Sequence, residues 1–127
     1  MTNKTGSPSI KGTIIQPSTV ADNAFKIPVV PFACTGVVYD NGVPDGSLCK
    51  IVIHGKAYVR TEDNIAIKRD WWVGASTVTA GTVLATTEPP GTGFVLVSQD
   101  HFREVGHTLT ERSAGSTALI LCQLHWL

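Results

Sequence analysis

Charge is scarce in this chain. Only 16% of its 127 residues are Asp, Glu, Lys or Arg, and ten basic residues balance ten acidic ones. Proteins that bind phosphate backbones carry a basic excess or a basic stripe, whereas the longest basic cluster here is Lys68-Arg69, which Asp70 follows directly. We therefore expect no direct nucleic-acid partner. A net charge near zero also removes the repulsion that keeps monomers apart, which favours a protein that works in an assembly.

Long apolar runs are also missing. The polar stretch from Met1 to Ser9 is not followed by the apolar core of a signal peptide, and no segment approaches the roughly 18 apolar residues of a membrane-spanning helix. We therefore expect no membrane partner, and a protein that is made in the cytoplasm and stays soluble.

Cysteine is rare, with single residues at Cys34, Cys49 and Cys122. An odd number at wide spacing matches neither a disulfide framework nor a zinc pattern. The sequence therefore predicts free thiols that are mostly buried and behave as small hydrophobic side chains.

Histidine is sparse as well, and its spacing indicates no metal centre. The motif H-E-x-x-H is absent, and His101 and His107 are six residues apart, which fits no simple ligand pattern on a helix or strand. We interpret His54, His101, His107 and His125 as surface or interface residues, and we expect no metal and no other cofactor. A histidine at a subunit interface would make assembly sensitive to pH.

Signatures of catalysis are missing too. There is no G-x-S-x-G elbow, and the Gly-rich stretch at 91–93 lacks the Lys-Ser/Thr that follows in a phosphate-binding loop. Ser98, Asp100 and His101 are close in sequence, but catalytic triads are recognised by geometry rather than adjacency. We expect no catalytic residues, and we keep a small hydrolase as an alternative that an electrophilic probe would reveal.

Alternation with a period of two is the clearest pattern that is present. It runs from Lys50 to Arg60 and places one set of side chains on a single face: Ile51, Ile53, Gly55, Ala57 and Val59. Turn-forming residues at 41–46 stand just upstream. The sequence therefore predicts that the segments Phe32–Tyr39 and Leu48–Arg60 are neighbouring antiparallel strands.

Further short strands follow, separated by turn signals, with one helical turn expected near His101–Val105. The final strand should point its apolar side chains inward: Ile120, Cys122, Leu124 and Trp126. Strands at this spacing favour a single small barrel or sandwich. The other predicted strand segments are Trp71–Val73, Thr77–Thr87 with a turn at Ala80-Gly81, Phe94–Ser98 and Ala118–Trp126.

The segment from Met1 to Ala24 differs from the rest, because it is rich in Thr, Ser, Asn, Lys and Pro and has only isolated apolar residues, among them Ile10, Ile14 and Ile15. Its prolines prevent a regular helix. Two interpretations stay open: an extended arm that becomes ordered against a neighbour, or an ordinary frayed terminus. This pattern divides the chain into an arm, 1–24, and a β domain, 25–127.

The pair Trp71-Trp72 is the most suggestive aromatic feature. Adjacent residues on a strand point to opposite faces, so one Trp can anchor the core while the other faces solvent or a partner. The alternative is that the core and a covering loop absorb both. The residues predicted to bind a partner are Ile10, Ile14, Ile15, Trp71, Trp72 and Trp126.

A series of short segments gives a resemblance. They are G-V-V-Y at 36–39, V-I-H-G-K-A-Y-V at 52–59, W-V-G-A-S at 72–76, T-A-G-T-V-L-A-T at 79–86 and V-G-H-T-L-T at 105–110, before a closing strand after Ser113-Ala114-Gly115. In this order, from Gly36 to Leu127, the chain resembles small capsid decoration (cement) proteins of tailed bacteriophages and related β-domains of phage head and tail fibres. Thr108 departs from the Ala that this family often has.

The resemblance implies a virion protein, made in the host cytoplasm, that binds the outer surface of the major capsid protein lattice, commonly as a homotrimer, and stabilises it. It carries over no catalytic residues. The expected fold is all-β, a single small antiparallel barrel or sandwich (β-tulip-like) with an extended N-terminal arm. The arm would add a strand to a neighbour, and many weak contacts would act together.

Besides the small hydrolase, two other functions stay open. A tail, neck or fibre-attachment protein of a phage would occur at low copy number in the particle. A carbohydrate-binding β module would use Trp71 or Trp72 as a platform for sugar rings, so that replacing either Trp by Ala would remove glycan binding.

Overall fold

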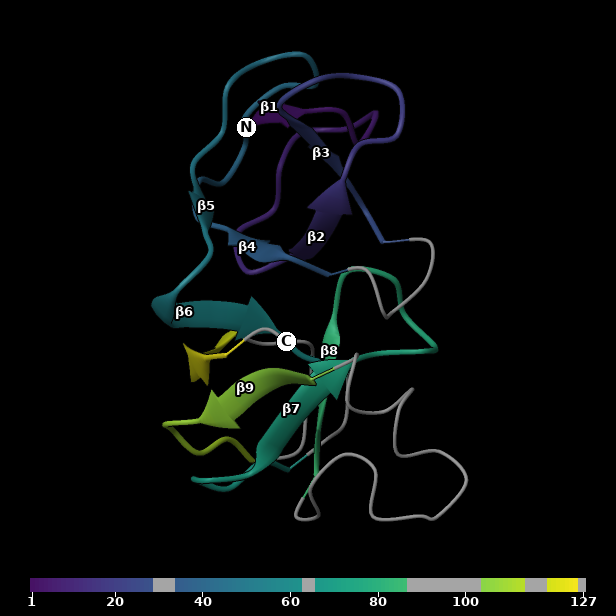
Figure 1. Cartoon of the computed structure of the whole chain (residues 1–127). Coiled ribbons are helices and arrows are strands. Elements are labelled where there is room, and N and C mark those ends of the chain that lie inside the picture. The colour runs from purple at the N-terminus through teal and green to yellow at the C-terminus, as the bar shows by residue number, and fades with distance from the viewer. Residues whose placement is uncertain (29–33, 63–65, 87–103, 114–118, 126–127) are drawn as a thin grey trace.

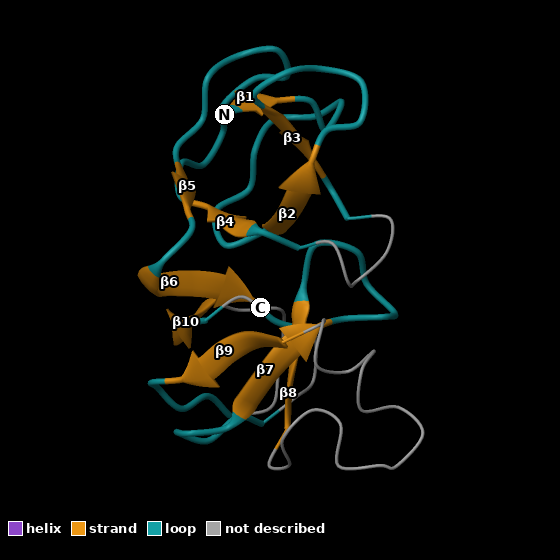
Figure 2. Cartoon of the chain, in the orientation of Figure 1, coloured by secondary structure: helices purple, strands orange, loops and turns teal. Residues whose placement is uncertain are grey.

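The computed structural model describes residues 1–28, 34–62, 66–86, 104–113 and 119–125, and every regular element in these ranges is a β-strand (Figure 2). The all-β prediction is confirmed. Two five-stranded sheets lie one above the other in Figure 1. Within the described ranges, no helix is long and apolar enough to cross a membrane.

The first sheet is built from the N-terminal strands. Neighbouring strands of this sheet are antiparallel, except for the first pair in the spatial order given next, which is parallel. In spatial order it contains β1 (Thr2–Asn3), β3 (Ala24–Lys26), β2 (Ile14–Pro17), β4 (Gly36–Val38) and β5 (Ile51–Val52).

The second sheet is antiparallel throughout its ladders. In spatial order it contains β6 (Gly55–Arg60), β10 (Leu119–Leu124), β9 (Glu104–Thr108), β7 (Trp72–Ala75) and β8 (Val83–Thr86). Its longest ladder joins β6 to β10 over six residue pairs.

Both sheets curl so that their outer strands approach each other. In the first sheet, Thr2 of β1 forms a bridge with Leu48, which lies just before β5. In the second, Thr61 follows β6 and forms a bridge with Val83 of β8. These bridges satisfy part of the main chain at the sheet edges, which would otherwise offer unpaired groups to other chains.

Two cores fill the molecule, and the first sheet contributes to both. Ile14 and Val37 are buried with the side chains of the second sheet, whereas Ile15 and Val38 are buried in a smaller cluster inside the first. Adjacent residues on a strand face opposite sides, so β2 and β4 form a wall with one core on each side.

Residues 1–24 do not form the expected extended arm. Ile14 and Ile15 are at most 1% exposed, and the terminal amine of Met1 donates to the carbonyl of Cys49 over 3.1 Å. Buried Asn3 donates from its Nδ2 to the carbonyls of Ser7 and Val43. The Pro, Ser and Asn residues that resemble a solvated tail instead form the turns of the first sheet, and its isolated isoleucines anchor the cores.

The predicted strand from 50 to 60 is correct in its pairing and wrong in its continuity. β4 pairs antiparallel with β5 as expected. The chain then leaves the first sheet, since β5 ends at Val52 and β6 begins in the second sheet at Gly55, whose φ of +84° redirects the chain at this point. Ile53 is therefore 53% exposed, while Ala57 and Val59 are buried as the alternation predicted.

The closing strand follows its predicted pattern. Ile120, Cys122 and Leu124 are at most 4% exposed and belong to the core of the second sheet. The turn predicted at Ala80-Gly81 is also present, with Gly81 at a φ of +80° just before β8. The strand predicted at 94–98 and the inward position predicted for Trp126 lie outside the described residues.

Candidate functional site

Strand β9 contains an irregularity that changes which side chains share a face. Its ladder with β7 pairs Val73 with Gly106 but Gly74 with Glu104, so Val105 has no partner in that ladder. Such a β-bulge sets two residues of one strand against one of the other. Residues three apart normally face opposite sides of a strand, but the bulge brings Glu104 to the face that carries His107.

Gly106 makes the bulge possible. A Cβ atom at this position would lie 1.9 Å from the main-chain oxygen of Gln123 on β10. No other residue fits at such a distance, so glycine allows the two strands to approach closely where the register shifts. The close approach brings the end of β10 beside the bulge.

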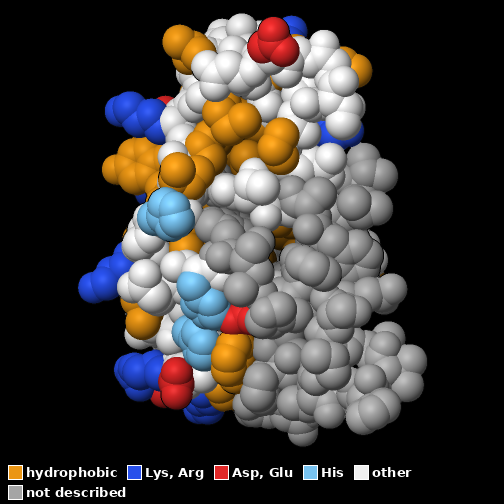
Figure 3. Space-filling model, in the orientation of Figure 1, with side chains coloured by type: hydrophobic (Ala, Val, Ile, Leu, Met, Phe, Trp, Pro, Cys, Tyr) orange, Lys and Arg blue, Asp and Glu red, His pale blue; other side chains and the backbone are white. Residues whose placement is uncertain are grey.

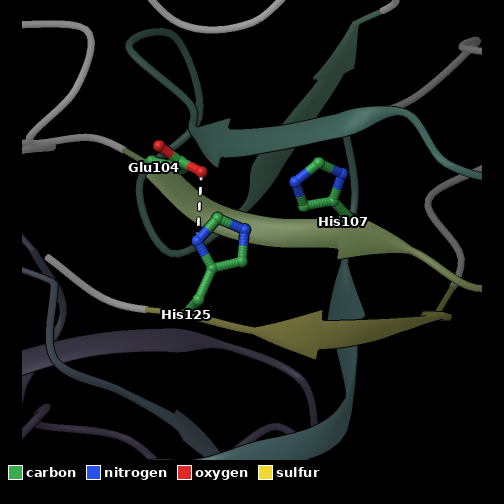
Figure 4. Close-up of side chains that lie close together, drawn as sticks. All are labelled: Glu104, His107 and His125. Carbon is green, nitrogen blue, oxygen red and sulfur yellow. Dashed lines mark ion pairs between the residues drawn. The ribbon is translucent and has the colours of Figure 1, made fainter.

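Glu104, His107 and His125 meet at this place (Figure 4). The main-chain N–H of His125 donates to the carbonyl of Val105 over 2.9 Å, which fixes His125 directly after β10. Its Nδ1 lies 3.1 Å from a carboxylate oxygen of Glu104. The two imidazole rings stack with centroids 4.9 Å apart. The three side chains form one cluster, which we call the Glu–His–His cluster.

Trp72 borders this cluster. Its ring centroid lies 4.1 Å from that of His107 and 6.2 Å from that of His125. Trp71, the preceding residue, is half-buried and packs against the core of the second sheet. The two Trp side chains therefore have different surroundings, and the ring of Trp72 is already in contact with a histidine.

The cluster combines a buried carboxylate with two buried imidazole nitrogens that have no hydrogen-bond partner among the described residues. The side chain of Glu104 is only 4% exposed. Among the described residues, no hydrogen bond reaches Nδ1 of His107 or Nε2 of His125, although both atoms are buried. Nδ1 of His107 lies 3.5 Å from the carboxylate of Asp70. Asp70 itself is exposed and has a φ of 61°.

No protein-family model, curated protein or solved structure matches this chain. Its function is therefore inferred from its own residues and their arrangement.

The residues predicted to bind a partner are not brought together. Ile14 and Ile15 lie in two different cores, so neither is available to a partner while the chain is folded. Ile10 is 51% exposed. Trp71 and Trp72 are half-buried, and Trp126 lies outside the described residues.

Sequence reasoning also missed the Glu–His–His cluster. It treated His107 and His125 separately, and expected a helical turn where the structure has the start of β9. The pairing of β9 with β10 brings the two histidines together. His54 is exposed, as the surface interpretation predicted, and His101 lies outside the described residues.

A second surface feature joins the two sheets. Tyr39, directly after β4, is 52% exposed, and Tyr58 on β6 is 47% exposed. The amine of Lys11 lies 5.2 Å from the first ring centroid and 5.7 Å from the second. We call these three residues the tyrosine patch. Figure 3 shows hydrophobic side chains gathered over the first sheet, with histidines lower on the same face.

Proposed function

We propose that this protein is a structural component of a bacteriophage particle, which decorates the outer surface of the head lattice and stabilises it. The observation that carries the proposal is the ordered series of segments between Gly36 and Leu127, which resembles that of capsid decoration proteins. An all-β body with low charge is compatible with this role. Its function would be binding rather than catalysis.

The fold changes the expected mode of attachment. Because residues 1–24 belong to the first sheet, they are not available to add a strand to a neighbour. Contacts through side chains on the folded surface take their place. The tyrosine patch is the candidate contact, since half-exposed aromatic residues are enriched in protein interfaces and Lys11 supplies a polar partner at its centre.

The test is to produce the chain together with the major capsid protein encoded by the same genome, and to count its copies on purified shells by quantitative mass spectrometry. We expect a copy number comparable to that of the capsid subunits, together with a higher melting temperature of the decorated shell. A few copies per particle would support a tail, neck or fibre-attachment role instead. No chain on shells or particles would overturn the proposal.

A double variant tests the tyrosine patch on the same shells. Replacing Tyr39 and Tyr58 by Ala should lower occupancy at least tenfold, because it removes the aromatic anchors and leaves both cores intact. Val20→Ala is the matched control, since Val20 is 88% exposed and apolar. Equal occupancy of the double variant and the control would exclude the patch as the contact.

A further inference from the structure

The Glu–His–His cluster offers the ligand set of a metal ion. One ligand atom from each of Glu104, His107 and His125 can be chosen so that all three lie within 4.8 Å of one another. Two imidazoles and one carboxylate suit Zn²⁺ and similar transition-metal dications. Mg²⁺ and Ca²⁺ prefer oxygen ligands alone, so the same set disfavours them.

The spacing within the cluster is close to that of ligands around one ion. With bonds of about 2.0–2.1 Å, two ligands of a tetrahedral Zn²⁺ lie roughly 3.4 Å apart. Nδ1 of His125 and the carboxylate oxygen of Glu104 are 3.1 Å apart. A ligand atom of His107 lies within 4.8 Å of the ligand atoms chosen from the other two residues, so a side-chain rotation of His107 would complete the set.

The ring of His107 lies in an orientation that suits an ion. Its Nδ1 faces the carboxylate of Asp70 at 3.5 Å, which leaves Nε2 for an ion. Figure 4 shows the rings of His107 and His125 side by side, with Nδ1 of His125 turned toward Glu104. Histidines that bind metals commonly present their other nitrogen to a carboxylate, which orients the ring and makes it a better ligand. Asp70 is placed to have this role.

The surroundings favour a bound cation as well. The carboxylate of Glu104 is almost fully buried, and a buried negative charge is stabilised by a neighbouring positive one. Nε2 of His125 is buried and makes no hydrogen bond with the described residues. With Nδ1 as the ligand atom of His125, this second nitrogen is left for a bound water, which a buried polar atom of this kind calls for. The ring of Trp72 covers one side of the cluster and limits its hydration.

We propose that Glu104, His107 and His125 bind a transition-metal dication, with Zn²⁺ as the best match, and that Asp70 orients His107. The ion would join β9 to the residue that follows β10, and so would stabilise the second sheet. Metal binding of this kind adds its free energy to folding. The inference is independent of the proposed function, because it rests on the cluster alone.

The test uses the full chain after treatment with EDTA and dialysis. Zn²⁺ is titrated by calorimetry, and the melting temperature is measured with and without Zn²⁺. We expect one ion per chain and a higher melting temperature. Glu104→Gln, His107→Ala and His125→Ala should each weaken binding at least tenfold. His54→Ala is the matched control, since it removes an exposed imidazole outside the cluster and should bind Zn²⁺ as the unmodified chain does.

Co²⁺ provides a readout of the ligands themselves. Its visible absorption is strong in a four- or five-coordinate site and weak in water. At one fixed Co²⁺ concentration, the spectrum should therefore intensify with the unmodified chain and with His54→Ala, and stay weak with Glu104→Gln, His107→Ala and His125→Ala. Asp70→Asn keeps a residue that tolerates a positive φ at an exposed position. It should fold and bind Zn²⁺ about tenfold more weakly, as loss of such an orienting carboxylate does.

Two results would overturn the proposal. One is the absence of saturable Zn²⁺ binding by the unmodified chain. The other is binding that the Glu104, His107 and His125 variants leave unchanged, which would place the ion elsewhere. If those variants fail to fold without metal, as judged by circular dichroism, the Asp70→Asn variant decides: an affinity and a Co²⁺ spectrum equal to those of the unmodified chain would count against the cluster.

Discussion

The two sheets reach a folded structure by different means. The first has strands of two to four residues and a core cluster of four buried residues, and side chains such as Asn3 stitch its turns to distant main chain. The second has strands of four to six residues around thirteen buried hydrophobic residues of the described chain. Hydrogen bonds from polar side chains therefore compensate for short strands where the core is small. The sheet with the longer strands is the one that accommodates a β-bulge and a polar cluster.

The largest effect is expected at the bulge of the second sheet. Gly106→Ala would place a methyl group 1.9 Å from the oxygen of Gln123, so β9 and β10 would have to separate. We expect a loss of about 4 kcal/mol or more in unfolding free energy, measured by urea denaturation.

Gly46→Ala is the control for this substitution. Gly46 has a φ of +86° but open space around it, so only the cost of its conformation, about 1 kcal/mol, should appear. A similar loss at the two positions would mean that the strands do not approach as closely as described.

The next effect separates the two cores at neighbouring positions. Ile14→Ala and Ile15→Ala should each cost about 2–5 kcal/mol, since both side chains are fully buried. Hydrogen exchange should show different regions affected. Ile15→Ala should speed amide exchange in β3 and β5, which contribute to the smaller core. Ile14→Ala should instead speed amide exchange in β6 and β8, which contribute to the larger core. Identical exchange patterns would show that the cores do not behave as separate clusters.

The smallest effect concerns a thiol in the second core. Burial raises the pKa of Cys122 from 9.0 to about 12. A pKa that is higher in the folded state gives stability that is present below pH 9 and is lost as pH rises from 9 toward 12. Unfolding free energy should therefore fall more between pH 8 and pH 10 for the unmodified chain than for Cys122→Ala.

Reactivity checks the same thiol independently. At pH 8, iodoacetamide should alkylate Cys122 far more slowly in the folded chain than in urea, because the thiolate is the reacting species. Equal rates in the two conditions would mean that Cys122 is accessible and its core position incorrect.

The sequence predicts the parts of the fold in which alternation is long enough to be read. β10 and the second half of the Lys50–Arg60 segment place their apolar residues as the period of two indicates, and Gly81 marks its turn. β1 and β3 contain two and three residues, too few to show a period, so the first sheet resembled a polar tail.

The site was hidden for a different reason. The bulge at Val105 puts Glu104 and His107 on one face at a spacing that a regular strand would place on two. His125 joins them only through the pairing of β10 with β9. Neither the insertion of one residue nor the choice of strand partner leaves a periodic trace in the sequence, so the cluster is visible only in three dimensions.

The wall formed by β2 and β4 has a consequence for recombination and engineering. Since Ile14 and Ile15 serve opposite cores, and Val37 and Val38 do the same, neither half of the molecule is a transferable module. A crossover between related chains at the junction near Gly55 would preserve every strand. It would still pair the core side chains of the second sheet with β2 and β4 from a different parent. Chimaeras should therefore succeed only when β2, β4 and the side chains facing them on both sides are inherited together.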